Sequence, residues 1–237
     1  MALIAAGDRE KIRELFKDLD SEVTITYFTQ RESPLLIPGH ECQFCKETRE
    51  ILEEVATLSD KISLQIKDFY RDEAEAKQRQ IERIPAFILE GRARGRLRFF
   101  GIPAGYEFST LIEDIRMLSR GETTLSPQTL QQLQSLQQDL HIQVFVTPTC
   151  PYCPRMALLA HELAIASQRV TADVVEVSEF VDLAQRYRVQ GVPKTVINDQ
   201  VEVLGAVPEA RLMQQIVQTF APTGTATEPP HSPQPPA

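Results

Sequence analysis

An internal repeat constrains the fold of this chain more than any other feature of its sequence. From Cys42 in "HECQFCKE" to Cys150 in "TPTCPYCPRM" is 108 residues, and from Pro85 in "RIPAFIL" to Pro193 in "GVPKTVI" is also 108. Each proline begins an apolar run. Each cysteine comes after a β-rich run, "EVTITYFT" in the first half and "HIQVFVT" in the second. A fixed period of this length predicts two copies of one domain and not a solenoid.

The two copies share one predicted order of elements: strand, CxxC, helix, strand, helix, two strands and a closing helix. Apolar residues at helical spacing predict helices over 8–20, 43–59, 71–80, 105–119, 126–140, 151–167, 179–187 and 208–220. Strands are predicted over 62–67 and 170–177. A strand, crossover helix and strand give a parallel pair, and two late strands add a hairpin. The sequence therefore predicts an α/β fold of two tandem domains, each a central mixed sheet flanked by helices.

The domain boundary is predicted near "RGETTLS", because this polar stretch separates the two copies. The first domain is expected to span residues 1–121 and the second residues 122–221. The remaining residues 222–237 contain six prolines and nothing to bury. We expect this proline-rich tail to be disordered.

Composition and charge exclude several classes of function. The chain is 42% hydrophobic and 24% charged, as in an ordinary globular protein, and its net charge of −8 disfavours binding to nucleic acid phosphates. No apolar run approaches the ~20 residues that span a bilayer, so no membrane segment is expected. The N-terminus lacks the basic flank and apolar stretch of a secretory signal. These features favour the cytoplasm, where paired cysteines usually serve redox chemistry or metal binding.

The CxxC spacing suits thiol–disulfide exchange. Cys42 and Cys150 stand where a strand ends and a helical pattern begins, and the unpaired N–H groups at a helix N-terminus favour thiolate over thiol. Their partners, Cys45 and Cys153, follow one turn later on the same helix face. The first sulfur can attack a substrate disulfide, and the second can resolve the mixed disulfide that results. The sequence thus predicts one attacking and one resolving thiol in each half.

Pro85 and Pro193 are candidate members of the same two sites. Each follows a β-branched residue and begins an otherwise apolar strand, where proline removes a hydrogen bond of the ladder. Their matched spacing of 40 residues from the second cysteine favours a cis peptide bond that faces the CxxC motif. The alternative is an ordinary trans proline at the start of a strand.

The duplicated strand–CxxC–helix unit with a proline downstream resembles the thioredoxin fold, and "CPYC" is typical of glutaredoxins. Two such units in one chain resemble the protein disulfide oxidoreductases, also called glutaredoxin-like proteins, of thermophilic archaea and bacteria. The resemblance covers roughly residues 8–220 and rests most on "FVTPTCPYCPRM" and "VQGVPKTVI". It implies thiol–disulfide exchange on protein substrates, with electrons supplied by a flavoprotein of the thioredoxin reductase type. The residues that it assigns to the sites are Cys150, Cys153 and Pro193 in the primary site and Cys42, Cys45 and Pro85 in the other.

Three departures from the pattern concern the site chemistry. "CQFC" is an unusual motif, so the first site is expected to be slower, to have a different redox potential, or to act as a relay for the second. Many thioredoxins bury an acid six residues ahead of the first cysteine, where this chain has Leu36 and Val144. Proton transfer must therefore use another group or water. The Gly-Gly pair of glutathione-binding glutaredoxins is replaced by Gly101-Ile102 and Gly205-Ala206, which argues against glutathione dependence.

Two other interpretations of the cysteines are weaker. CxxC…CxxC is also a zinc-ligand spacing, but a whole domain separates the pairs and each pair has its own strand–helix context. Two purely structural disulfides would restrain little chain entropy, because each closes a four-residue loop.

Two functions from different classes remain. The first is a cytoplasmic thiol–disulfide oxidoreductase acting on proteins. The second is an electron-transfer module resembling the double-thioredoxin N-terminal part of alkyl hydroperoxide reductase flavoproteins, which serves a peroxiredoxin. No dinucleotide-binding glycine fingerprint is present, so no cofactor is expected on this chain and any flavin must come from another one.

Overall fold

The computed structural model describes residues 4–31 and 42–220. The proline-rich tail and Leu36 lie outside these residues. Each half contributes four strands: β1 (Val23–Thr29), β2 (Ile62–Asp68), β3 (Ala86–Glu90) and β4 (Arg96–Phe100), then β5 (Leu140–Val146), β6 (Val170–Glu176), β7 (Lys194–Ile197) and β8 (Val201–Leu204). The helices are α1 (Ala6–Phe16), α2 (Cys45–Ala56), α3 (Glu73–Gln78), α4 (Glu107–Arg120), α5 (Pro127–Ser135), α6 (Cys153–Ala166), α7 (Val181–Arg186) and α8 (Glu209–Phe220).

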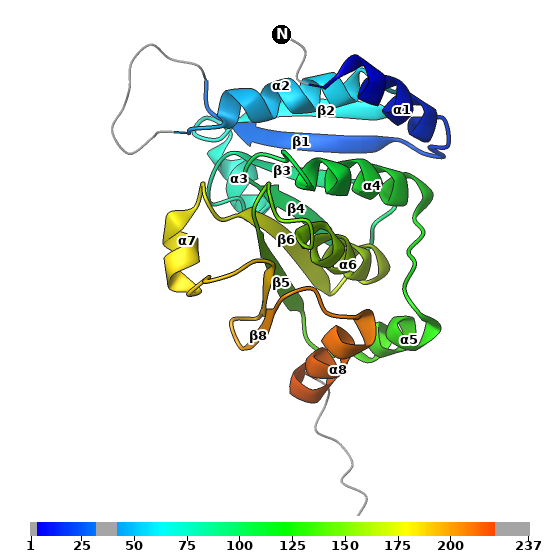
Figure 1. The fold of residues 1–237 in the computed structure, drawn as a ribbon, viewed down its shortest axis with the longest axis vertical. Helices are drawn as coiled ribbons and strands as arrows, with labels where there is room; N and C mark the ends of the chain where they lie inside the picture. Colours follow the sequence, from blue (N-terminus) through cyan, green and yellow to red (C-terminus); the bar gives the residue numbers. More distant parts are fainter. Residues whose placement is uncertain (1–3, 32–41, 221–237) are drawn as a thin grey trace, which may run out of the picture.

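All eight described strands form a single sheet in the order β2-β1-β3-β4-β6-β5-β7-β8 (Figure 1). Within each half, the strand before the CxxC motif pairs in parallel with the next strand and antiparallel with the strand that follows the proline. The predicted mixed sheet with a late hairpin is confirmed in both halves. The sequence did not indicate that β4 and β6 would pair in parallel and join the two sheets into one.

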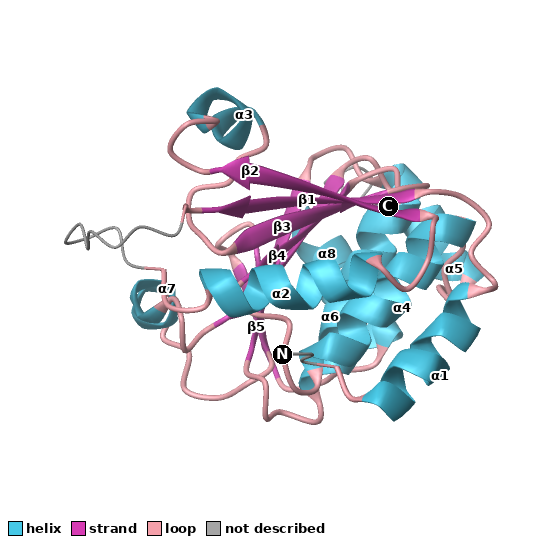
Figure 2. Cartoon of the chain, turned by 90° about the horizontal axis from the view of Figure 1, so that it is seen from above, coloured by secondary structure: helices cyan, strands magenta, loops and turns pink. Residues whose placement is uncertain are grey.

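Alternation along the strands creates two apolar layers, one on each face of the sheet. Tyr27, Phe99 and Val174 point into the larger layer, which is covered by α2, α4 and α6. Their neighbours Phe28 and Phe100 point into a smaller layer with residues of α3 and α7. Figure 2 shows the large helices together on one side, with α3 and α7 apart from them. The larger layer is therefore shared by the two halves.

The helices occur in the predicted order, and each is shorter than predicted. The helix predicted over 126–140 ends at Ser135, and Leu140 instead begins β5. The leucine stripe misled the prediction because a buried strand also begins with an apolar residue. Ser126 caps α5, since its hydroxyl accepts a hydrogen bond from the N–H of Thr129, with Pro127 in the first helical turn.

The predicted domain boundary lies between α4 and α5, where Gly121 ends α4 in a left-handed conformation. The division into domains over 1–121 and 122–221 stays a prediction. In the described parts of the chain, no helix combines the length and apolar character needed to cross a membrane.

Candidate active sites at the two CxxC motifs

The four cysteines form two disulfides, each within its own motif. Cys42 is joined to Cys45 and Cys150 to Cys153, with 5.5 Å between the Cα atoms in both pairs. The sulfurs of the two halves are therefore paired separately, as the prediction of one dithiol site per half requires.

Each active helix begins at the second cysteine and not at the first. In the second half, the chain turns after β5, where the N–H of Cys150 donates to the carbonyl of Thr147 (3.1 Å), and α6 starts at Cys153. Pro154 occupies the first helical turn, where a missing N–H costs nothing. Pro151, predicted in the helix, lies in the preceding turn. The first cysteine consequently stands just ahead of the free N–H groups of α6.

Burial distinguishes the two sulfurs of the CPYC site. Cys150 is 8% exposed, whereas Cys153 is fully buried under α6. Cys42 is likewise more exposed than Cys45 in the first half. In each pair the first cysteine is therefore closer to the protein surface than the second, as expected for an attacking thiol with a protected partner.

Both prolines are cis, as predicted. The bonds are Ile84–Pro85 and Val192–Pro193, and both proline carbonyls accept a hydrogen bond at 2.8 Å from a glycine N–H, that of Gly101 or Gly205. In the second half the sulfur of Cys150 lies 3.7 Å from the carbonyl oxygen of Val192. The fold thus brings the CPYC motif and its proline strand together, although 42 residues separate these two atoms in sequence.

A buried tyrosine forms a hydrogen bond with the backbone of the first site. The hydroxyl of Tyr27, a fully buried residue of β1, donates to the carbonyl of Cys45 at 2.7 Å. Burial raises the pKa of Tyr27 well above its usual range, so the hydroxyl keeps its proton. This bond fixes the first turn of α2 relative to the sheet.

A buried carboxyl that the sequence analysis missed lies in the first turn of α4. Glu107 is fully buried in the first turn of α4, where its Oε2 accepts a hydrogen bond from the Thr110 hydroxyl (3.0 Å). Its Oε1 has no hydrogen-bond partner among the described residues. Burial raises the pKa of Glu107 to about 7, and the Thr110 bond opposes this effect while the charge of Asp114 adds to it. Its spacing of four from Leu111 could have indicated a buried position.

The contacts of α4 place its first turn next to the loop that precedes Cys150. The N–H of Tyr106 donates to the carbonyl of Pro148 (2.9 Å), two residues ahead of Cys150. Farther along, Asp114 of α4 lies 2.7 Å from the imidazole of His161 on α6. Glu107 lies two helical turns before Asp114 on α4, and Pro154 lies two turns before His161 on α6. The first turns of α4 and α6 therefore lie side by side.

Gly105 permits this close approach of the two halves. Its φ is +60°, and an added Cβ would lie 2.2 Å from the carbonyl oxygen of Pro148. We expect Gly105→Ala to lower the free energy of unfolding by about 1–3 kcal/mol and to slow thiol exchange at CPYC, because the loop before Cys150 must shift. Urea denaturation and the rate of Cys150 alkylation would measure the two effects. Gly7→Ala, at a helical glycine with open space around it, is the control.

A second cross-half carboxyl lies near the first site. Glu179, which follows β6, accepts a hydrogen bond from the N–H of Ile102 at 2.6 Å, next to the Gly101 that binds the carbonyl of Pro85. Burial raises the pKa of Glu179 to about 7, and the charges of Glu176 and Glu47 act in the same direction. Each half thus places a carboxyl of elevated pKa near the other half's CxxC motif.

Each half of the chain matches a different family model. Residues 140–218 match the family model of a thioredoxin domain. The second half is therefore similar to a thioredoxin domain. Residues 10–102 match a model described as a domain of unknown function. The CPYC motif and cis-Pro193 lie inside the thioredoxin match.

Several curated relatives are enzyme components longer than this chain. The F subunit of alkyl hydroperoxide reductase in Xanthomonas campestris pv. phaseoli is 27% identical over 156 residues, which cover 65% of this chain and 28% of that protein. The protein of the same name in Pseudomonas putida is 24% identical over 157 residues, covering 66% and 28%. The matched part of this chain thus spans little more than a quarter of these relatives.

Solved structures share the fold over most of the chain. A protein disulfide oxidoreductase from Aeropyrum pernix K1 is 27% identical, with a TM-score of 0.81 over 91% of this chain and 93% of that one. The F subunit of the alkyl hydroperoxide reductase in Enterococcus faecalis, at 22% identity and a TM-score of 0.79, covers 90% of this chain and 98% of that one and shares the fold. The predicted resemblance is therefore confirmed. Thioredoxin folds with a CxxC disulfide in each half support thiol–disulfide oxidoreductase chemistry as the general class of activity.

Proposed function

We propose that this chain exchanges dithiols and disulfides on protein substrates through two sites, of which CPYC is the primary one. The observation that carries this proposal is the arrangement around Cys150: its sulfur stands at the rim, 3.7 Å from the Val192 carbonyl, above a fully buried Cys153. An extended substrate chain can pair with the backbone beside Pro193 and present its disulfide to this sulfur.

Exposed apolar side chains around Cys150 support a protein as the substrate. Tyr152, inside the CPYC motif, is 69% exposed, and so is Leu204 at the end of β8. Leu204 lies beside Gly191, next to the Val192–Pro193 peptide. Tyr106, half exposed, flanks the same loop through its bond to Pro148. Apolar surface around a reactive sulfur provides contact area for a polypeptide.

In the reducing direction, the thiolate of Cys150 attacks one sulfur of the substrate disulfide. A bond forms between these two sulfurs, the substrate S–S bond breaks, and the leaving thiolate takes up a proton. Cys153 then transfers its proton to Glu107 and attacks the sulfur of Cys150. The mixed disulfide breaks, the second substrate sulfur leaves as a thiolate that takes up the proton held by Glu107, and the Cys150–Cys153 disulfide remains. Two electrons have passed to the substrate, and the reverse sequence forms a disulfide.

Glu107 would thereby supply the acid that Val144 cannot. A pKa near 7 suits a group that must both accept and release a proton at neutral pH. We expect Glu107→Gln to slow the resolving step on the order of 100-fold at neutral pH and to remove the pH dependence centred near 7. Stopped-flow decay of a mixed disulfide on Cys150, measured from pH 5 to 9, would test this. An unchanged pH profile would remove Glu107 from the mechanism, and Glu113→Gln, in the same helix, is the control.

A second candidate function is favoured by the relatives, which belong to alkyl hydroperoxide reductases. In that role the chain would accept electrons from a flavoprotein reductase and pass them to a peroxiredoxin through the same CPYC site. Both roles need an external flavoprotein of the thioredoxin reductase type as electron source.

Insulin reduction separates the two candidates. With thioredoxin reductase and NADPH, the proposed function predicts that the full chain precipitates insulin by reducing its disulfides. The electron-transfer role predicts turnover with a peroxiredoxin and peroxide but none with insulin. The Cys150→Ser/Cys42→Ser double variant is the blank for both assays. Failure of both substrates with a chemically reduced chain would refute both functions.

A further inference from the structure

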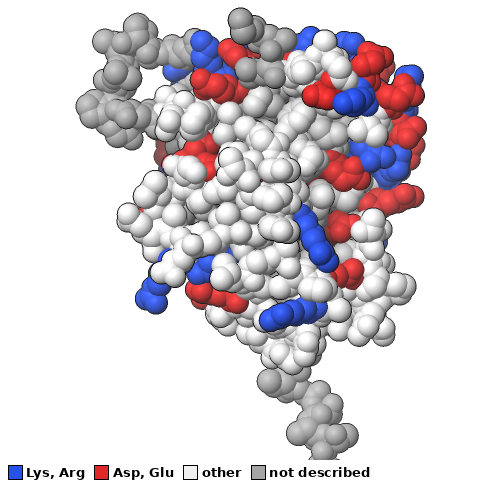
Figure 3. Space-filling model, in the orientation of Figure 1, with Lys and Arg blue, Asp and Glu red and all other residues white. Residues whose placement is uncertain are grey.

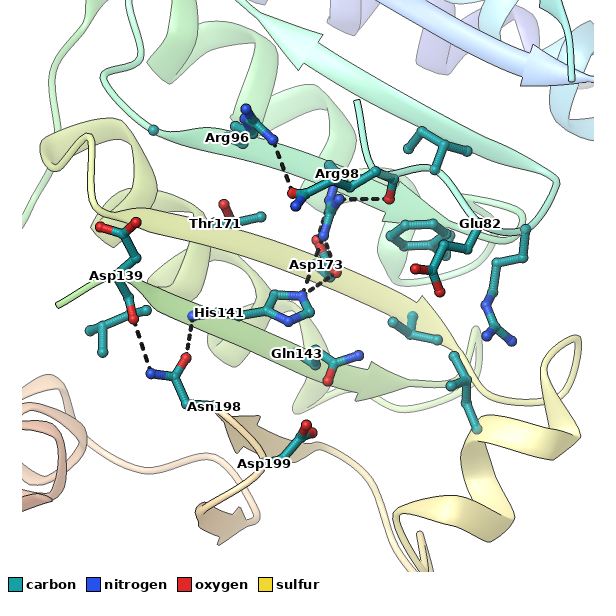
Figure 4. A pocket seen from close by; sticks show the side chains of 18 of the residues that line it. Glu82, Arg96, Arg98, Asp139, His141, Gln143, Thr171, Asp173, Asn198 and Asp199 are labelled. Carbon is teal, nitrogen blue, oxygen red and sulfur yellow. Dashed lines mark hydrogen bonds and ion pairs between the residues drawn. The ribbon is translucent and has the colours of Figure 1, made fainter. Parts of the chain in front are cut away.

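A polar groove crosses the sheet where the two halves meet, away from both CxxC motifs. It has a volume of about 870 Å³, and its floor is formed by β4, β6 and β5 (Figure 4). The turn after α3 and the helix α7 form its sides. The groove lies on the face opposite α2 and α6, beside the early residues of the strands. The CxxC motifs follow the other ends of β1 and β5.

The strands are patterned for a polar floor on this face. Apart from Leu140, the side chains that line the groove from the early part of the three strands are polar, while those between them on the same strands are apolar and buried in the larger layer. The polar set is Arg96, Arg98, His141, Gln143, Thr171 and Asp173. Parallel strands in the middle of a sheet are normally covered on both faces. Here β6 is parallel to both neighbours, yet its early residues face a groove.

The lining is cationic in an acidic chain. It includes seven arginine and lysine side chains and four carboxylates, although the whole chain has a net charge of −8. Figure 3 shows the opposite signs interspersed on the face that it presents, over α1 and α2 and along the right-hand edge. A local excess of positive charge inside a hollow concentrates anions there.

Most of these cations already have a carboxylate. Arg98 forms two hydrogen bonds with Asp173 (2.7 and 2.8 Å) in the buried floor. Arg169 lies 3.2 Å from Asp139 and Arg186 lies 3.7 Å from Asp199. Lys77 and Arg83 pair with Glu73 and Asp182 outside the groove lining.

Two arginines of the groove lining have no carboxylate partner among the described residues. Arg94 and Arg96 flank Gly95 at the entry to β4, and both are exposed at the groove. Neither forms an ion pair with a carboxylate of the described residues, and Arg96 donates only to the amide oxygen of Gln80 (3.0 Å). Thr171 is the strand partner of Arg96 and adds a hydroxyl to the floor. The positive excess is thus concentrated at one end of the groove.

We propose that this groove binds a small organic polyanion carrying at least two phosphate or carboxylate groups, with Arg94 and Arg96 as its anchoring residues. The guanidinium forks bind such oxygens in pairs. The volume lies within the range of about 300–1,000 Å³ that is typical of small-molecule sites. Gln143 and Thr171 offer neutral hydrogen bonds farther in. The proposal is independent of the redox function, because no residue named for the sites lines the groove.

Calorimetric titration of the full chain with pyrophosphate, an inorganic probe that carries the two linked phosphate groups of such a ligand, tests the proposal. We expect one binding site whose affinity falls as ionic strength rises. Arg94→Ser/Arg96→Ser should weaken binding by roughly tenfold or more, because each lost charge-assisted hydrogen bond costs about that factor. Arg13→Ser/Arg211→Ser removes two exposed arginines on α1 and α8 and should leave the affinity unchanged. Retained insulin reduction and an unchanged unfolding midpoint would show that both variants are folded.

Three results would overturn the proposal. The first is no saturable binding of pyrophosphate or of citrate to the unaltered chain. The second is an equal loss of affinity in both double variants, which would indicate attraction to the surface at large. The third is binding of a glutamate-rich peptide without binding of pyrophosphate. That result would make the groove a surface for a protein segment.

Discussion

Replacing Cys150 with serine is expected to reduce insulin-disulfide reduction to the uncatalysed rate, whereas Cys42→Ser should retain a substantial part of the activity. Cys150 stands ahead of the free N–H groups of α6, with cis-Pro193 beside it and Tyr152 and Leu204 exposed around it. A serine hydroxyl ionises far less readily than a thiol and cannot form a mixed disulfide. Progress curves with a reductase-coupled assay would measure both variants.

The Cys153→Ser variant gives a matched control for this hierarchy. It keeps the attacking thiol but lacks the resolving one, so it should accumulate a stable mixed disulfide with its substrate, detectable by mass spectrometry. Cys45→Ser is the corresponding control in the first half. Equal loss of activity in Cys42→Ser and Cys150→Ser would contradict the assignment of CPYC as the primary site. It would indicate instead a relay in which electrons must pass through both motifs.

The second large effect is expected at the junction of the two halves. Arg98→Leu should lower the free energy of unfolding by about 3–5 kcal/mol, because it leaves the buried carboxylate of Asp173 without its guanidinium and with only the His141 imidazole at 2.6 Å. These residues are register partners in the β4–β6 pair, and both side chains are almost fully buried. Arg98 also donates to the carbonyl of Gln80 (2.8 Å), which ties the turn after α3 to the sheet. Urea denaturation at pH 7 would measure the loss.

The double variant Arg98→Leu/Asp173→Leu separates two contributions to the free energy of unfolding. One is the cost of burying the Asp173 carboxylate without Arg98, and the other is the net stabilisation by the ion pair. We expect it to recover most of the stability lost in Arg98→Leu, because a buried ion pair replaced by packed apolar groups is often nearly neutral. An equally unstable double variant would show that the pair itself stabilises the junction. The single variant Asp173→Leu completes the double-mutant cycle. It should lower the free energy of unfolding about as much as Arg98→Leu does.

The difference in stability between the unaltered chain and Arg98→Leu should depend on pH. Burial alone would raise the pKa of Asp173, but the charges of Arg98 and His141 outweigh it and hold the pKa below its ordinary value of 3.8. The ion pair is therefore fully present above that ordinary value and is lost as the pH falls through the lower, folded-state pKa. The gap in stability between the unaltered chain and Arg98→Leu should shrink below about pH 4. A gap that stays constant down to pH 2 would contradict this account.

Several features of the site followed from local sequence rules. The equal spacings of the cysteines and prolines predicted two units with one chemistry, and the matched distance of each proline from its CxxC motif favoured the cis bonds that the fold contains. Leu140 shows the limit of such rules, because an apolar residue fits a helix stripe and a buried strand equally well. The start of α6 was also misplaced, since Pro151 suits either a turn or a first helical turn.

The sequence by itself determined what each half is: a strand–CxxC–helix unit with a proline strand beside it, because those signals lie within one local run or repeat at a fixed distance. The tertiary structure alone decided how the halves meet. Parallel pairing of β4 with β6 brings the first turn of α4 to the loop before Cys150 and Glu179 to Ile102, and it creates the cationic groove at the junction. Pairing between distant strands depends on which edges and apolar faces can be buried together, and no local pattern records that choice.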